Sequence, residues 1–215
     1  LWEQRSFTFT ADDASAALRF ASLDTGNTAA IADVQVIEIP PAVSTILNND
    51  PTLSYDAATG KFYRFVDAGV GWNAALAGAT SSQLNGVNGQ LLVVESQYEN
   101  DLMYAKALSA DINIWLGMSD RTSEGQWVQM DGSSDGELFW SGTGSGSAQN
   151  GNYANWHLDN GQPNDGGGGQ DHAQLMHNVG GQWDDAIEST ANAYVIEWDA
   201  SEVLSSFTFE ITDQD

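Results

Sequence analysis

The sequence predicts an α+β domain, residues 56–200, that is inserted in or flanked by a partial all-β sandwich formed by residues 1–55 and 201–215. Two observations support this split arrangement. Both ends of the chain alternate apolar and polar residues, which is typical of half-buried strands. The centre instead combines strand patterns, two stretches of helical spacing and a long Gly-, Asn- and Ser-rich region. Because the terminal strands are too few to bury a core separately, we expect them to share one sheet system.

The N-terminal strands are expected in "SFTFT", "AALRFASLD" and "IADVQVIEI", each bounded by turn residues. A Pro40-Pro41 break follows, and residues 42–60 are predicted to form a linker or loop because Asn-Asn-Asp-Pro and Ala-Thr-Gly are turn signals. The final "SSFTFEITDQD" is again a short alternating strand. Since the sequence starts inside a strand pattern, we expect a piece of a longer protein, with any secretion signal elsewhere.

The central elements follow in order along the chain. "KFYRFV" predicts a strand, "WNAALAGATSSQL" a helix and "QLLVV" a second strand. Ser96 and Glu99 form a capping box that starts another helix, whose Met103, Ala107 and Leu108 face is expected to pack in the core. "INIWLGMSD" predicts a buried strand. The long loop region after it is the place where function is expected, because ordered domains rarely keep such loops otherwise.

Charge and composition exclude several classes of function. Thirty acidic and six basic residues give a formal charge of −24, which repels nucleic acid and anionic membranes and attracts cations; a solvated halophilic surface is the alternative explanation. The absence of cysteine excludes disulfides, thiolate metal sites and a Cys nucleophile. No apolar run reaches the ~18 residues of a membrane span. No hydrolase, zinc-protease or phosphate-loop motif is present, so the sequence favours a binding protein over an enzyme.

Four motifs in the centre occur in a characteristic order: "IWLGMSD", "GQPNDGGGGQDHAQL", "QWDDA" and "AYVIEW". Together they resemble the C-type lectin-like domain over roughly residues 60–199, which implies that fold and carbohydrate binding. The chain departs from the family pattern in two ways. It lacks the usual cysteines, with His172 at a Cys position, so core packing and calcium must hold the fold. It also has Gln-Pro-Asn where Glu-Pro-Asn or Gln-Pro-Asp is usual.

The resemblance implies a Ca²⁺ ion that also coordinates the sugar. Calcium prefers six to eight oxygen ligands, and two carboxylates with three amides supply both charge and oxygen. Pro163 is expected to follow a cis peptide bond, which aims its neighbours at one ion; an ordinary trans turn is the alternative. The implied ligands are Gln162, Asn164, Gln170, Asp184 and Asp185.

A second, auxiliary calcium site is implied by matching carboxylates. The alternative is a solvated turn in which Arg121 is the internal counterion. These auxiliary ligands are Asp120, Glu124, Asp165 and Asp171.

The predicted sugar-binding residues are the calcium ligands Gln162, Asn164, Gln170 and Asp184 together with Trp156 and His157. Trp140 and Tyr153 lie near the same loop and could also present a ring to a sugar. Core packing is expected for the remaining tryptophans of the centre, and a structural role for both His172 and His177. The core tryptophans are Trp115, Trp127, Trp183 and Trp198.

The predicted function is that of a calcium-dependent lectin module in a secreted bacterial adhesin of the RTX type, used for attachment at the cell surface. Its partner would be one monosaccharide unit of a cell-surface glycan, with fucose or mannose favoured over galactose because Asn164 keeps the mannose-type half of the motif. The module is expected to be monomeric within its longer chain. Alternatives are a protein- or peptide-binding module on the same fold, a structural spacer rigidified by calcium, and an enzyme on a related scaffold.

Overall fold

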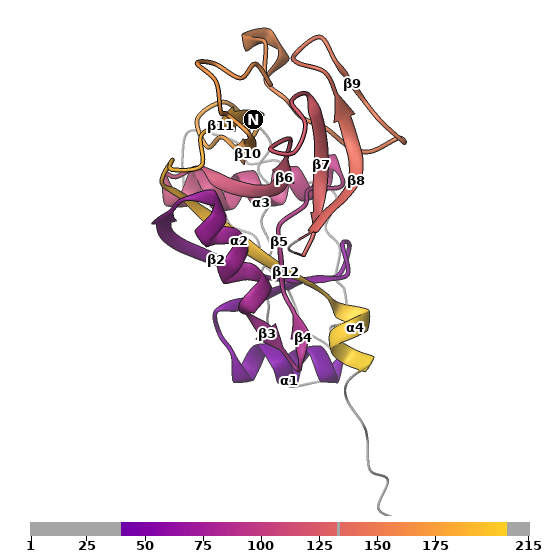
Figure 1. Cartoon of the computed structure of the whole chain (residues 1–215). Helices are drawn as coiled ribbons and strands as arrows, with labels where there is room; N and C mark the ends of the chain where they lie inside the picture. Colours follow the sequence, from indigo (N-terminus) through magenta and orange to yellow (C-terminus); the bar gives the residue numbers. More distant parts are fainter. Residues whose placement is uncertain (1–39, 133, 206–215) are drawn as a thin grey trace, which may run out of the picture.

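The computed structural model describes residues 40–132 and 134–205. These residues form one body in which helices cover a long, twisted sheet and extended loops lie at one end (Figure 1). The helices are α1 (Pro41–Asn49), α2 (Trp72–Ser81), α3 (Gln97–Ala110), α4 (Ala200–Ser205) and the 3₁₀ turn η1 (Leu158–Asn160). The strands are β1 (Leu53–Asp56), β2 (Lys61–Val70), β3 (Gln83–Leu84), β4 (Val87–Asn88), β5 (Gln90–Leu91), β6 (Ile114–Ser119), β7 (Gln126–Asp131), β8 (Ser134–Ser141), β9 (Ser147–Ala148), β10 (His172–Leu175), β11 (Trp183–Ala186) and β12 (Asn192–Asp199).

The main sheet runs in the order β1-β2-β12-β6-β7-β8-β9. β2 and β12 pair antiparallel from Lys61↔Asp199 to Asn192↔Val70, and β12 pairs parallel with β6 at Ala193↔Ile114. β10 branches from β6 and pairs with β11. The loops after β6, β9 and β11 therefore lie close together, because β10 pairs with both β6 and β11.

Two hydrophobic clusters form the core. One gathers α1, α2 and α4 around Phe62, Trp72 and Trp198. The other packs α3 against the sheet and the aromatic side chains below the long loop, including Trp127, Trp156 and Trp183. All six residues of β6 are buried, as the sequence predicts for a strand covered on both faces. Packing of this extent replaces the disulfides that the chain lacks.

The predicted helices are confirmed with small corrections. The Ser96 hydroxyl accepts a hydrogen bond from Glu99 N, so Ser96 is the N-cap of α3. The second hydrogen bond of the capping box differs from the usual pattern, because the Glu99 carboxylate accepts from the backbone N–H of Glu95 and not from that of Ser96. Met103 and Ala107 are buried, but the prediction for Leu108 is wrong: its side chain is 52% exposed, because it lies beside the buried stripe of the helix and not on it.

Residues 42–60 are not the predicted linker. Most of them form α1 and β1, whose Val43, Ile46 and Leu53 are buried in the core cluster with Phe62 and Trp72. The Asn-Asn-Asp-Pro sequence marks the end of α1 and the turn into β1, so the turn signals are real but the segment between them is ordered and packed.

The predicted split β-sandwich falls largely on residues 1–39 and 206–215, which lie outside the described residues. Within the described chain, residues 201–205 are helical and belong to α4, where a strand was expected. α1 and α4 lie together at the end of the molecule opposite the long loops (Figure 1) and share one hydrophobic cluster. The domain limits at residues 55 and 200 stay a prediction. No helix of the described residues is both long enough and apolar enough to cross a membrane.

Candidate metal centre

The predicted calcium ligands come from the long loop between β9 and β10 and from β11. Asp185 connects the two, because its Oδ2 accepts hydrogen bonds from the backbone N–H groups of Asn164 (2.8 Å) and Asp165 (2.6 Å). Gln170 Nε2 donates to the backbone oxygen of Asp185 at 3.0 Å. The Gln162–Pro163 peptide bond is cis, as predicted. These contacts hold the loop and the strand in one fixed arrangement.

Two amide oxygens of the predicted set converge around Gly166. A Cβ atom at this glycine would lie 2.6 Å from Gln170 Oε1 and 2.8 Å from Asn164 Oδ1. Any larger residue would therefore collide with both oxygens. Gly166 keeps space open between two of the side chains that the resemblance implies as ligands.

Three further oxygens of the set are buried without a hydrogen-bond partner among the described residues. They are Gln162 Oε1, Asp184 Oδ1 and Asp185 Oδ1. An unsatisfied buried polar atom costs about 1–3 kcal/mol, and more when it is charged, so three together indicate a missing partner. Carboxylate and amide oxygens with open lone pairs fit a hard cation such as Ca²⁺.

The two aspartates also repel one another. Burial raises the pKa of both carboxyl groups, and the charge of Asp185 raises that of Asp184 further. A donated hydrogen bond from Gln174 Nε2 to Asp184 Oδ2, at 3.2 Å, and the nearby charge of His157 oppose this rise only in part. A bound divalent cation would favour the ionised form of both groups.

The auxiliary site is also supported by geometry. Carboxylate oxygens of Asp120, Glu124 and Asp171 lie within 4.8 Å of one another. Asp120 is only 2% exposed, its Oδ1 has no hydrogen-bond partner in the described chain, and its Oδ2 accepts from Gly125 N at 2.8 Å. Asp165 lies outside this group of three, but burial raises the pKa of Glu124 and the charge of Asp165 adds to that rise.

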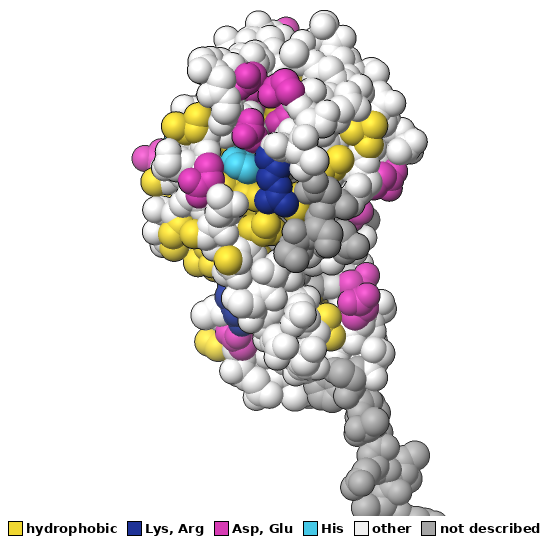
Figure 2. All heavy atoms as spheres, in the orientation of Figure 1, with side chains coloured by type: hydrophobic (Ala, Val, Ile, Leu, Met, Phe, Trp, Pro, Cys, Tyr) yellow, Lys and Arg dark blue, Asp and Glu magenta, His cyan; other side chains and the backbone are white. Residues whose placement is uncertain are grey.

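Burial is the main reason that the pKa of Asp120 rises, to about 7, and the charges of Glu124 and Asp171 add to it. Acidic side chains gather on the upper part of the face shown in Figure 2, beside a histidine and a basic side chain. The arrangement can therefore bind a cation, which removes the repulsion among these carboxylates.

The two tryptophans near the long loop are buried, so neither presents its ring to a sugar in this conformation. Trp156 is 3% exposed, because its ring packs against Trp127 at 4.7 Å and Trp183 at 5.8 Å between ring centroids. Trp140 is buried too, and Tyr153 donates from its hydroxyl to Gln97. Proximity to a loop in sequence does not establish exposure, since the loop here folds back over its own tryptophans.

Two exposed apolar side chains near the site were not identified from the sequence. Leu158 and Ile187 are 50% and 47% exposed, and they directly follow His157 and the end of β11. Their only sequence signal is that each adjoins a predicted site segment. His157 itself is partly exposed, which leaves it available to a ligand.

The two remaining histidines have structural surroundings, as predicted. The His172 ring is buried and stacks on Trp72 with 4.1 Å between centroids. Burial, with a smaller contribution from the Arg121 charge, lowers the pKa of His172 to about 4, so the ring is neutral at physiological pH. His177 contacts Asn113 at 2.8 Å and Asp111 at 3.3 Å. The ring stack at His172 occupies the position where the related pattern has a cysteine.

Comparison with known proteins identifies the family of this chain. Residues 82–196 match the family model described as the Lectin C-type domain. Halomucin of Haloquadratum walsbyi is 29% identical over 203 residues, which is 94% of this chain and 2% of halomucin. The low affinity immunoglobulin epsilon Fc receptor of Mus musculus is 33% identical over 112 residues, 52% of this chain and 27% of the receptor. The chain thus spans only a small part of these relatives.

Solved structures share the fold. The C-type lectin CEL-I from Cucumaria echinata has a TM-score of 0.53 and 24% identity, and the match covers 68% of this chain and 94% of CEL-I. The herring type II antifreeze protein has a TM-score of 0.51 at 17% identity, covering 70% of this chain and 98% of that protein. At these identities the likeness concerns the fold alone.

Proposed function

Because the chain belongs to the Lectin C-type domain family, we propose that it is a calcium-dependent carbohydrate-binding module. The observation that supports calcium most strongly is the set of buried oxygens without partners at Gln162, Asp184 and Asp185. The paired amide oxygens of Asn164 and Gln170 beside Gly166 complete the proposed set. A folded chain that buried these groups with no cation would carry several uncompensated desolvation costs.

The sugar is proposed to bind through two adjacent hydroxyl groups at positions that the protein ligands leave open on the ion. Gln162 and Asn164 can each give a carbonyl oxygen to calcium and an N–H to a sugar hydroxyl, whereas Asp184 can accept a hydroxyl proton. Affinity for a single sugar is expected to be about millimolar, because one shallow ring buries little surface. Leu158 and Ile187 are proposed to take the apolar contacts first assigned to Trp156.

We propose fucose or mannose as the preferred sugar, because Asn164 matches the mannose-type half of the motif. The Asn164→Asp variant should shift preference toward galactose. The larger context proposed is a module of an RTX-type adhesin at a bacterial cell surface. It rests on the acidic composition and on a match in which almost the whole chain corresponds to 2% of halomucin.

A glycan array probed with the full chain, with and without a chelator, tests the proposal. Fucose- or mannose-containing glycans should be bound in calcium and released by chelation, and free fucose and mannose should compete better than galactose. The Asp185→Asn variant should abolish binding, whereas Asp101→Asn on α3 should leave it unchanged. Binding that survives chelation would favour a protein- or peptide-binding module. Calcium-dependent stability without any glycan binding would favour a structural spacer.

A further inference from the structure

A cavity of about 470 Å³ lies away from the candidate metal centre. Its walls come from β2, the β4–β5 segment, the β7–β8 hairpin, β12 and α4, and none of the predicted calcium or sugar ligands lines it. The volume falls within the range of about 300–1,000 Å³ that is typical of small-molecule pockets. The cavity is thus a separate site.

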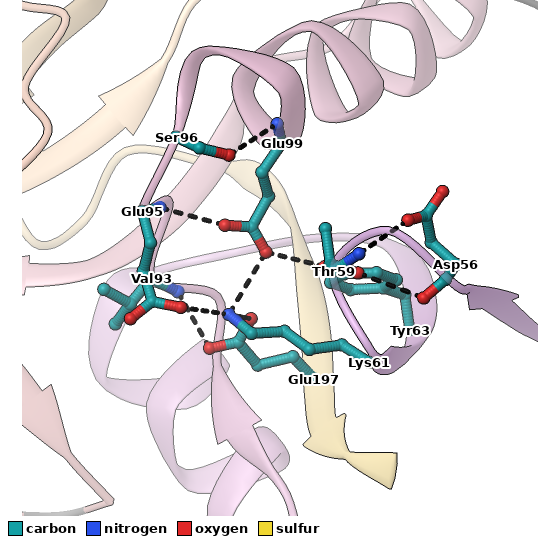
Figure 3. A network of polar contacts seen from close by, with 9 residues as sticks. All are labelled: Asp56, Thr59, Lys61, Tyr63, Val93, Glu95, Ser96, Glu99 and Glu197. Atoms are coloured by element: carbon teal, nitrogen blue, oxygen red, sulfur yellow. Dashed lines mark hydrogen bonds and ion pairs between the residues drawn. The ribbon is translucent and has the colours of Figure 1, made fainter.

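The charge of the cavity is strongly negative. Its lining holds one ammonium group, Lys61, and five carboxyl groups: Glu95, Glu137, Glu197, Asp199 and Glu202. Figure 3 shows that the ammonium group is already engaged, and its Nζ lies 2.8 Å from Glu95, 3.2 Å from Glu99 and 3.1 Å from Glu197. The other carboxylates of the lining, Glu137, Asp199 and Glu202, form no salt bridge with a described residue. A cationic group is the natural complement.

Trp198 supplies a second and independent observation. This residue lines the cavity and is 2% exposed, yet its indole Nε1 is buried and has no hydrogen-bond partner among the described residues. An indole N–H can only donate, so its missing partner is an acceptor such as a hydroxyl oxygen. The buried side chains of Val93 and Met130 add apolar wall for a carbon skeleton. A bare metal ion would neither fill this volume nor accept from the indole.

We propose that this cavity binds a small ammonium compound that carries hydroxyl groups, an amino sugar or an amino alcohol, and that it does so without calcium. The ammonium group pairs with the carboxylates at the mouth, Glu137 and Glu202. The hydroxyl groups meet the Trp198 N–H and the amide side chains of Asn88, Gln90 and Gln129, which also line the cavity. The carboxylates of the cavity wall thus complement the ammonium group of the ligand, and the indole and amide groups complement its hydroxyl groups.

Calorimetric titration of the full chain with three matched probes tests the proposal. Glucosamine carries both features, glucose lacks the charge, and cyclohexylamine lacks the hydroxyl groups. The titrations are done in excess chelator, so that the calcium site does not contribute. At about pH 6.5, below the pKa of an ordinary α-amino group, both amines are protonated. Glucosamine should bind about tenfold more tightly than either other probe, a difference of about 1.4 kcal/mol. Equal affinity for glucose would overturn the proposal.

Paired variants separate the cavity from general attraction to an acidic protein. Glu137→Gln with Glu202→Gln removes two charges at the mouth, neither of which contacts Lys61. Asp101→Asn with Asp111→Asn removes two exposed charges on and just after α3. The first pair should weaken glucosamine binding about tenfold and the second pair should not change it. An equal effect of both pairs would show nonspecific attraction and sink the idea, as would binding unaffected by the first pair.

Discussion

The carboxylates around Lys61 differ from those of the candidate metal centre in whether the protein itself supplies a partner. Glu99 and Glu197 are buried, but both contact the Lys61 ammonium group, and Glu99 also accepts from the Tyr63 hydroxyl at 2.6 Å (Figure 3). At the candidate metal centre, Asp120, Asp184 and Asp185 each keep a buried oxygen with no hydrogen-bond partner in the described chain. The first group is complete within the protein. The second group has no such partner in the described chain, and we propose that a cation from solution supplies it.

This difference shows what distinguishes a structural cluster from a binding site. Acidic residues alone are uninformative in a chain with thirty of them. Burial without an internal counterion is informative, because folding would otherwise carry an uncompensated cost. Mutation but not chelation should thus change the stability contributed by the Lys61 network (Lys61, Tyr63, Glu95, Glu99 and Glu197). Both should change the stability contributed by the candidate metal centre.

The largest effect is expected for Lys61→Met. Removing this cation leaves Glu99 and Glu197 buried beside one another, and breaking a buried ion pair by removing one partner costs about 3–5 kcal/mol. Burial lowers the pKa of Lys61, but attraction by Glu197, Glu99 and Glu95 outweighs it and raises the pKa above its ordinary value. Denaturant unfolding measures the loss, and added calcium should not restore it.

The matched control for this variant is Lys106→Met on the exposed side of α3. It should change the free energy of unfolding by no more than about 0.5 kcal/mol. Similar losses for the two lysines would mean that the Lys61 network is not the main support of this region.

Chelation should have the next largest effect. A ligand that binds only the folded state stabilises it by about 2.7 kcal/mol at a hundredfold excess over its dissociation constant. For a domain of this size the melting temperature should rise by about 5 to 10 °C in saturating calcium. Differential scanning fluorimetry with calcium and with chelator gives the difference.

Two variants sharpen the calcium measurement. Asp185→Asn should remove most of the calcium-induced rise in melting temperature, while Asp101→Asn keeps all of it. If wild-type protein melts at the same temperature in calcium and in chelator, the proposed metal centre is wrong, whatever the carbohydrate results are.

A pH profile should separate the two regions again. Burial raises the pKa of Glu197 from its ordinary 4.5 to about 7, although Lys61 opposes the rise. Because the folded state holds this proton more tightly, Glu197 contributes stability below about pH 4.5 that is lost as the pH rises to about 7. At ~1.4 kcal/mol for each pKa unit, the loss should be at most about 3 kcal/mol.

This profile is best recorded in saturating calcium, which would keep the carboxylates of the proposed metal centre ionised. The Glu197→Gln variant should then show a flatter dependence of unfolding free energy between about pH 4.5 and 7. An unchanged slope in the variant would assign the effect to other groups.

The smallest effect is expected for Glu95→Gln. The Glu95 side chain is 61% exposed, so its 2.8 Å contact with Lys61 is screened by solvent. Exposed ion pairs contribute about 0–1 kcal/mol. A much larger loss in denaturant unfolding would show that the network depends on all three glutamates and not chiefly on the two buried ones.

Local motifs explain how far the sequence alone could predict this molecule. Gln162, Asn164 and Asp185 could be named together because their segments are short and have a recognisable order, and the structure connects Asn164 directly to Asp185. The capping residue of α3 could be predicted for the same reason, since Ser96 and Glu99 are three residues apart. Such local motifs can be recognised in the sequence without knowledge of the tertiary fold.

Features that depend on distant contacts could not be predicted. Lys61 and Glu197 are 136 residues apart in sequence, and nothing local marks them as partners. The burial of Trp156 arises from packing against Trp127 and Trp183, so a ring predicted to meet sugar became part of the core. Likewise α1 has turn residues at its end, and only its packing against Phe62 and Trp72 makes it part of the domain.

The closeness of α1 and α4 has a mechanical consequence. The described chain enters and leaves at the same end, where β2 and β12 begin their ladder at Lys61↔Asp199 and Ala200 N donates to Gly60 O at 2.9 Å. A force pulling residues 40 and 205 apart would therefore act on the β2–β12 hydrogen bonds one pair after another, starting at Lys61↔Asp199, because these bonds lie across the strands. The force would reach the long loops at the other end only after β2 and β12 had separated. Lys61 lies at the first residue pair of this ladder, where it contacts Glu95, Glu99 and Glu197. Its ion pairs would therefore resist the first step of strand separation under force.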